Sequence, residues 1–362
     1  MNINILKKEE KAVFTLRELY SSYGYTPYKM SKFEEYDLYA GNKDFLVSDR
    51  VITFNDTDGR LLALKPDVTL SIVKNTVGGT RKVYYNENVY RVSGATGQFK
   101  EIMQTGLECI GEITQHDIFE VVYLAAESLS KISDDFVLDI SHMGVITAIL
   151  ESLELTTAAK KRITALISEK NAHELKEYCA SIGIENDKTD TLMKLVSVYG
   201  DRKKVLERLS ESGDFAQAAS AIDELRRLDS FIDGFDKEGR VRFDFSVVND
   251  MSYYNGIVFK GFVNGIADGV LSGGEYGKLL PVIGSEGNAI GFALYLDMLS
   301  ELDSEYDRYD VDVLLQYSEG DDPALVFAEK ARLIVMGNRV FASVALPDKL
   351  RYARLVRFGE DK

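Results

Sequence analysis

Two long β-type segments joined by a short link constrain the fold of this chain more than any other feature. Residues 82–92, KVYYNENVYRV, and 98–112, QFKEIMQTGLECIGE, are rich in β-branched and aromatic residues, and the link between them is SGATG. A link this short permits only an antiparallel pair, because parallel neighbours need a crossover of about a dozen residues. Two further β-type runs flank Asp58-Gly59, a dipeptide typical of a type I′ hairpin turn. The chain is therefore expected to build an antiparallel sheet.

Helices are expected to flank this sheet, which gives an α+β fold. The hydrophobic spacing predicts helices at 7–23, 116–132, 143–153 and 289–302, and strands at 136–141, 241–248, 253–263 and 270–280. The regular βαβα alternation of a Rossmann fold and the glycine-rich nucleotide loops are both absent from the sequence.

We expect two domains. The first covers residues 1–303 and contains a helical insertion at about 155–235, where the composition becomes charged and β-poor. Within it, four short amphipathic helices are predicted at 158–170, 172–183, 190–200 and 217–233. The second domain, residues 304–362, is a small α/β segment whose strand, helix and strand form one parallel βαβ unit.

The charge balance and the rare residues exclude several classes of function. Asp and Glu outnumber Lys and Arg by 58 to 43, so the field of the chain opposes binding of a nucleic acid. No apolar run is long enough to span a membrane, and the N-terminus lacks the apolar segment of a secretory signal. Two cysteines and three scattered histidines predict a cytoplasmic chain with no metal or other cofactor.

Polar residues interrupt apolar elements at two places. Gln104 and Glu108 share one face of a predicted strand, with Gly106 between them leaving that face open. They are either the floor of a binding site or part of a half-exposed sheet face. Asp67 and Thr69 lie where a strand becomes a helix. Asp67 either caps that helix or anchors the ammonium group of a ligand.

Two further stretches carry candidate ligand contacts. Arg91 ends a strand beside the glycine-bearing link, where it could clamp a carboxylate or phosphate or lie as a solvated charge. Tyr253 and Tyr254 precede a glycine and are either core residues or contacts to a ligand. No single stretch is specific, but their order along the chain is.

Read in order, these stretches resemble the catalytic core of class II aminoacyl-tRNA synthetases, and most closely histidyl-tRNA synthetase. LKPDVT is similar to L-R-P-E-G-T, VYRVSGATGQFKEIMQTGLECIG to motif 2, and AIGFALYLDML to motif 3, within residues 8–300. YYNGIVF and GGEYGKLL resemble the histidine-binding region. The resemblance implies that the residues contacting histidine are Asp67, Thr69, Gln104, Glu108, Tyr253 and Tyr254, with Arg91 near its carboxylate.

Departures from the synthetase pattern fall on the nucleotide site. Met298 occupies the position of the motif 3 arginine, Asn249 that of a second arginine, and Ser93 that of the motif 2 glutamate. Tyr295 replaces a glycine and would crowd ATP. Because each lost electrostatic contact typically costs about 3 kcal/mol of barrier, adenylation is not expected, and no residue is assigned a catalytic role.

LDISHMGVITAILESL and LKPDVT resemble a related family, the regulatory subunits of ATP phosphoribosyltransferase. This resemblance implies a non-catalytic subunit that assembles with a short-form catalytic subunit in the first step of histidine biosynthesis. It would permit activity, transmit feedback by histidine, and form a homodimer core within a hetero-oligomer. The alternatives are an active histidyl-tRNA synthetase or other adenylate-forming enzyme, or a synthetase-like protein with another partner. The C-terminal segment, 304–362, resembles a truncated anticodon-binding domain. Arg351, Arg354 and Arg357 make its end basic, which favours a solvated face over a contact to RNA or an acidic partner.

Overall fold

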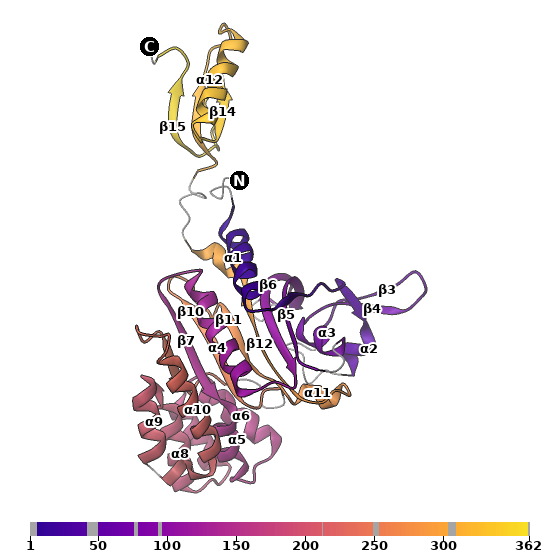
Figure 1. The fold of residues 1–362 in the computed structure, drawn as a ribbon, viewed down its shortest axis with the longest axis vertical. Coiled ribbons are helices and arrows are strands. Elements are labelled where there is room, and N and C mark those ends of the chain that lie inside the picture. The colour runs from indigo at the N-terminus through magenta and orange to yellow at the C-terminus, as the bar shows by residue number, and fades with distance from the viewer. Residues whose placement is uncertain are drawn as a thin grey trace. The chain divides into compact units, whose positions relative to one another are not determined.

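The structure is a computed structural model that describes residues 6–41, 50–75, 79–92, 96–211, 213–248, 253–302 and 309–360. Residues 12–301 form one compact unit, and residues 302–362 form a second together with residues 1–11. Each unit has its own hydrophobic core. The two units are described separately (Figure 1).

A nine-stranded sheet in the order β1-β5-β6-β12-β11-β10-β7-β9-β8 forms the centre of the larger unit (Figure 1). The pairs from β5 to β7 are all antiparallel, whereas β1 joins β5 and β9 joins β7 in parallel. The expected antiparallel sheet is therefore confirmed, with parallel strands added outside it. The strands are β1 Thr26–Pro27, β5 Arg81–Val92, β6 Phe99–Gly111, β7 Phe136–His142, β8 Tyr199–Gly200, β9 Val241–Asp244, β10 Ile257–Val263, β11 Leu271–Glu275 and β12 Asn288–Tyr295.

The helix expected at 289–302 is wrong. Residues Asn288–Tyr295 form strand β12, which lies between β6 and β11, and only Leu296–Glu301 (η4) is helical, as a 3₁₀ turn. The strand is buried on both faces along most of its length, so its sequence is a continuous apolar run. Such a run has neither the period of a helix nor that of a half-buried strand, which is why the pattern was ambiguous.

Helices α1 Lys8–Ser22 and α4 Gln115–Ser130 cover one face of the sheet. The ring of Tyr20 on α1 contacts that of Phe292 at 6.0 Å between centroids, and its hydroxyl lies 3.0 Å from Ser128 on α4. A side chain at Gly261 would collide with Leu129 of α4, so this glycine lets the helix approach the sheet. The opposite face, which carries Gln104 and Glu108, is left for a site.

A small sheet in the order β2-β4-β3 leads into helix α3 Thr69–Lys74. Its hairpin does form, but the predicted type I′ turn is wrong. Gly59 has φ +83° while Asp58 stays outside the positive-φ region, and the amide of Gly59 donates to Asp56 O at 2.9 Å. The loop therefore has three residues with glycine in the left-handed position, a common alternative. The remaining elements here are β2 Phe33–Glu35, α2 Tyr36–Ala40, β3 Thr53–Asn55 and β4 Leu61–Leu64.

The helical insertion follows α5 Met143–Glu151 and contains more helix than the sequence predicted. Its elements are α6 Thr157–Ser168, α7 Ala172–Ser181, α8 Asn186–Val196, α9 Arg202–Glu211, η3 Gly213–Ala218 and α10 Ala219–Ile232. Helix α9 was not predicted, because its sequence is mostly charged and few apolar positions mark its buried side.

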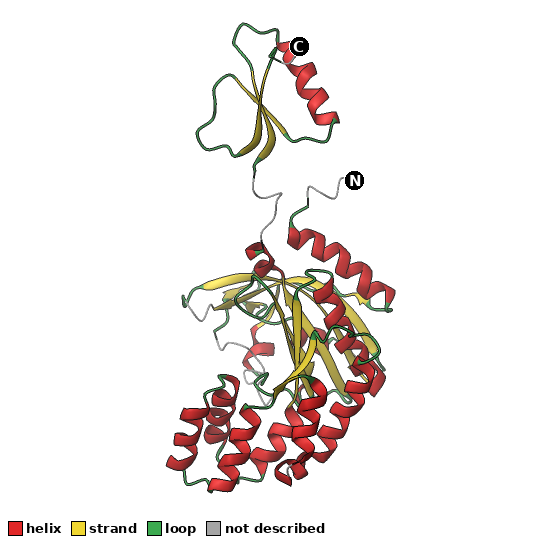
Figure 2. Cartoon of the chain, turned by 90° about the vertical axis from the view of Figure 1, so that its left-hand side faces the viewer, coloured by secondary structure: helices red, strands yellow, loops and turns green. Residues whose placement is uncertain are grey.

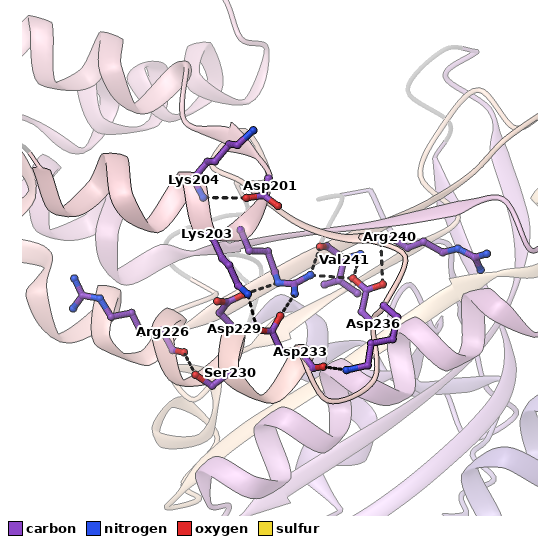
Figure 3. Close-up of polar contacts among 12 residues, drawn as sticks. Asp201, Lys203, Lys204, Arg226, Asp229, Ser230, Asp233, Asp236, Arg240 and Val241 are labelled. Atoms are coloured by element: carbon purple, nitrogen blue, oxygen red, sulfur yellow. Dashed lines mark hydrogen bonds and ion pairs between the residues drawn. The ribbon is translucent and has the colours of Figure 1, made fainter.

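Arg202 ties the insertion to the sheet. Its side chain is only 9% exposed and pairs with Asp229, Asp233 and Asp236 at 2.7–2.9 Å. It also donates to the carbonyl of Val241 on β9 at 2.8 Å. Figure 3 shows these acceptors converging from α10 and the chain that follows it. A buried guanidinium with this many acceptors fixes the relative position of α9, α10 and β9.

In the C-terminal unit, helix α12 Pro323–Val335 packs on three parallel strands in the order β14-β13-β15 (Figure 2). The predicted βαβ unit is present as β13 Val311–Gln316, α12 and β14 Val340–Ser343. The third strand, β15 Tyr352–Arg357, was not predicted, because its arginines mark it as a solvated end.

Candidate functional site

The register of the sheet places Gln104 and Glu108 on the face opposite α1 and α4. On β12, Tyr295 lies beside Gln104 and Gly291 beside Glu108. Gln104 and Glu108 are 1% and 2% exposed, so the alternative of a half-exposed sheet face is wrong. A side chain at Gly291 would collide with the carboxyl group of Glu108, which makes this glycine a requirement of the site.

The surface between the two residues is not open. The ring of Tyr85 covers Gly106, where an added Cβ would collide with it. The Tyr85 hydroxyl lies 3.4 Å from the carbonyl of Phe292. Sequence reasoning missed this cover because Tyr85 belongs to the neighbouring strand, and only the pairing of Tyr85 with Gly106 brings it there.

Glu108 is the most strongly perturbed acid of the site. Thr69 donates a hydrogen bond to it at 2.7 Å, and the hydroxyl of Tyr276 donates a second one. Burial raises the pKa of Glu108 to about 8, although both hydrogen bonds lower it, and the charge of Asp67 raises it further. Glu108 therefore carries a proton in much of the population at neutral pH.

Tyrosine rings surround this carboxyl group. Tyr253 stacks against Tyr254 at 4.6 Å between centroids and against Tyr276 at 5.5 Å. Burial raises the pKa of each of these phenols above its usual range. Tyr276 was not predicted as a site residue. Its position directly after the Gly-Gly-Glu of GGEYGKLL is the signal that could have identified it.

Asp67 and Arg91 meet at the edge of the site. One oxygen of Asp67 accepts from the amide of Leu70 at 2.9 Å, so Asp67 does cap the start of α3. Its other oxygen accepts from Arg91 Nη2 at 3.4 Å, while Arg91 Nε donates to the carbonyl of Pro66 at 2.7 Å. The guanidinium is thus oriented by this loop, with further N–H donors left for a ligand.

A groove of about 860 Å³ runs along this face of the sheet. Arg91, Ile102, Tyr295 and Met298 line one end of it. Gln104 lies directly across from Tyr295, and its buried Nε2 has no hydrogen-bond partner. An unpaired buried amide costs about 1–3 kcal/mol, which a ligand acceptor would recover.

Charged residues line the other end of the groove. Lys170 pairs with Asp244 at 2.8 Å, and Lys260 with Asp268 at 3.0 Å. Burial, and then the charge of Asp244, raise the pKa of the nearby Asp139 to about 6.

Of the residues predicted to contact a ligand, Thr69 contacts Glu108, Asp67 contacts Arg91, and Tyr253 contacts Tyr254, whereas Gln104 lies apart from them beside Tyr295. Tyr295 and Met298, the predicted departures at the nucleotide site, line the same groove. Asn249 and Ser93 lie outside the described residues. In the part of the chain that the structure covers, no cluster of His, Cys, Asp and Glu could hold a metal ion. No helix among those residues is long and apolar enough to cross a membrane.

Comparisons with known proteins agree with this geometry. A sequence model described as histidyl-tRNA synthetase matches residues 4–299. The ATP phosphoribosyltransferase regulatory subunit of Thermoanaerobacter sp. (strain X514) is 31% identical over 324 residues, which cover 86% of this chain and 83% of that protein.

Solved structures show the same fold. A protein from Bacillus halodurans C, described as an ATP phosphoribosyltransferase regulatory subunit/histidyl-tRNA synthetase, superposes with a TM-score of 0.74 at 23% identity. The alignment covers 99% of this chain and 96% of that one. A chain of the ATP phosphoribosyl transferase complex from Thermotoga maritima gives a TM-score of 0.63 at 21% identity, covering 80% and 97%. The expected class II synthetase-like α+β fold is confirmed, and the chain belongs to the family of ATP phosphoribosyltransferase regulatory subunits, whose core is that of histidyl-tRNA synthetase.

Proposed function

We propose that this chain is a non-catalytic regulatory subunit of ATP phosphoribosyltransferase that works in the cytoplasm. It assembles with a short-form catalytic subunit, is required for its activity in the first step of histidine biosynthesis, and transmits feedback by histidine. The names of its relatives and the complex from Thermotoga maritima support the partner. Its own core is a homodimer within this hetero-oligomer.

The observation that carries the proposal is a contrast between this groove and the buried polar cluster that adjoins it at Arg91. Where the synthetase family has an arginine for the triphosphate, the groove is lined by Met298, and Tyr295 adds bulk beside it. Arg91 remains, but the charge of Asp67 partly offsets its own. Without an arginine at position 298 the transition state of adenylation lacks one preorganised cation. The cluster around Asp67, Thr69 and Glu108 keeps its buried polar groups.

Histidine is the ligand proposed for that cluster. Its ammonium group would lie near Asp67 and Thr69, and its carboxylate near Arg91 and the unpaired amide N–H of Gln104, which needs an acceptor. Its imidazole would lie among the tyrosine rings, Tyr253 and Tyr254 included, and share a proton with Glu108, because the two groups titrate within about two pH units of each other.

Calorimetric titration with histidine tests the pocket, with and without the catalytic subunit. We expect heat of binding from the wild type and none from Gln104→Leu, which removes the unpaired amide without leaving a buried orphan. Gln98→Leu is the matched control, because Gln98 is exposed on the β5–β6 link. If Gln104→Leu binds histidine as tightly as the wild type does, the proposed histidine pocket is wrong.

The subunit role is tested by copurification with a short-form catalytic subunit, followed by an activity assay. We expect activity only when both chains are present, and inhibition by histidine. The main alternative, an active synthetase, predicts histidine-dependent exchange of pyrophosphate into ATP by this chain alone. We expect no exchange, and detecting it would contradict our interpretation of Met298.

A further inference from the structure

Exposed apolar residues lie along one side of α12. Val326 and Leu333 point inward and join the core of the C-terminal unit. Phe327, Ile334 and Val335 expose 71%, 49% and 87% of their surfaces. In residues 309–360, Figure 2 shows no second helix against this side of α12.

These exposed residues form one stripe. At about 100° per residue, Phe327, Ile334 and Val335 fall within a sector of roughly 120°. The small residues in the same sector are Ala324, Ala328 and Ala331. Glu329 and Arg332 lie outside it and are paired with each other at 2.6 Å. The stripe is therefore free of charge and wide enough to pack against another helix.

The order of residues in the stripe matches a second copy of itself. Phe327 and Val335 each lie four residues from Ala331, on opposite sides of it, and Ala328 and Ile334 each lie three residues away. In an antiparallel pair centred on Ala331, Phe327 meets Val335, Ile334 meets Ala328, and the two Ala331 residues face each other on the two-fold axis. Each large side chain then meets a smaller one, as close helix packing requires.

Charge also permits this contact. Residues 309–360 carry eight acidic and seven basic residues, whereas the whole chain carries a net charge of −15. Electrostatic repulsion between two copies of the chain therefore arises mainly outside the C-terminal unit. The nearly neutral C-terminal unit also has no net charge that would attract a strongly charged partner.

The area of the stripe sets the strength of the contact. If a large apolar side chain offers about 150–200 Å², the three large residues together expose roughly 350 Å². A stable dimer buries about 800 Å² on each partner. The stripe is too small to hold two free chains together, but it can act between chains that are already joined, at a high effective concentration.

We propose that α12 of one chain packs antiparallel against α12 of a second copy, centred on Ala331, as an additional contact between chains paired through their cores. This inference rests on the homodimer core of the proposed function. It assigns the C-terminal unit to assembly of the subunit.

Cysteine cross-linking in the full-length chain tests the contact. Cys109 and Cys179 are buried, so a cysteine introduced on the surface is the reactive one. With a mild oxidant, Ala331→Cys should form a disulfide-linked dimer at least ten-fold faster than Glu319→Cys, which lies on an exposed loop of the same unit. Adding Phe327→Glu to Ala331→Cys should reduce the rate to that of Glu319→Cys. Leu325→Glu should not, because Leu325 is similarly exposed, at 59%, but lies outside the stripe.

Sedimentation of the wild type separates this inference from the homodimer on which it rests. A dimer in which Ala331→Cys cross-links no faster than Glu319→Cys overturns the α12 contact alone. A monomer without cross-linking overturns both. If Phe327→Glu increases hydrogen exchange within residues 12–301 and no cross-link forms, α12 docks within its own chain and the proposal is wrong.

Discussion

Replacing Glu108 by glutamine should change how the stability of the protein depends on pH. Glu108 is 2% exposed, and burial raises its pKa to about 8 from an ordinary value of 4.5. Between these two values the folded protein holds a proton that the unfolded chain has released. Folding therefore becomes less favourable as the pH rises, and the stability present below about pH 4.5 is lost as the pH passes through about 8.

The size of the effect follows from the shift. At about 1.4 kcal/mol per pKa unit, the wild type should lose roughly 4 kcal/mol of unfolding free energy through this group between pH 5 and pH 9. Glutamine does not titrate, so Glu108→Gln should not show this loss. Glutamine accepts one of the bonds made by Thr69 and Tyr276 through its oxygen, but its NH2 group cannot accept the other, so the variant should also lose about 1 kcal/mol at every pH.

Urea unfolding of both proteins at pH 5, 7 and 9 measures the difference. Glu275 also has a raised pKa, but it is present in both proteins and cancels. We expect the variant to be slightly less stable at pH 5 and clearly more stable at pH 9. Parallel pH profiles would refute the reasoning, since they would mean that Glu108 ionises as freely in the fold as in the unfolded chain.

Two further pairs of substitutions test the helical insertion. Lys170 and Glu154 both have positive φ, +52° and +49°. In thermal unfolding, Glu154→Gly should raise the unfolding free energy of the protein by roughly 0.5–1 kcal/mol. Lys170→Gly should raise it by less, because this variant also loses the ion pair with Asp244. Equal gains would show that this pair contributes nothing. In urea unfolding, Arg202→Met should lower the unfolding free energy by about 3–5 kcal/mol, because it leaves buried aspartates without a cation. Arg226→Met, on the surface of the insertion, should lower it by less than about 1 kcal/mol. A loss below 1 kcal/mol for Arg202→Met would contradict the anchoring role.

The sequence predicted those parts of the structure that depend on neighbouring residues in the chain. The short link fixed the antiparallel pairing of β5 with β6, and the two-residue period of a strand put Gln104 and Glu108 on one face. Asp67 capping α3 is also a local effect, since it acts on Leu70 three residues away. Each of these follows from geometry within a few residues.

The parts that sequence reasoning missed depend on distant partners. Strand β12 is a strand because β6 and β11 supply hydrogen bonds on both sides of it. The register of β5 with β6 brings Tyr85 over Gly106, and the place of β12 between β6 and β11 brings Tyr276 to Glu108. No short stretch of the sequence specifies these contacts between distant residues. They appear only when the order of the strands is known.

The same distinction bears on our proposal that the chain lacks adenylation but keeps a pocket. Gly291 on β12 lies directly beside Glu108 on β6, and the Glu108 carboxyl group fills the space that a side chain at position 291 would need. A larger residue at position 291 would therefore disturb the sheet. Met298 follows the end of β12 in a 3₁₀ turn at the edge of the groove, where replacing an arginine leaves every strand pairing intact. Folding alone would therefore retain most of the proposed pocket. Gln104 is different, because its unpaired amide costs stability in the free protein, and an acceptor on the proposed ligand would recover that cost.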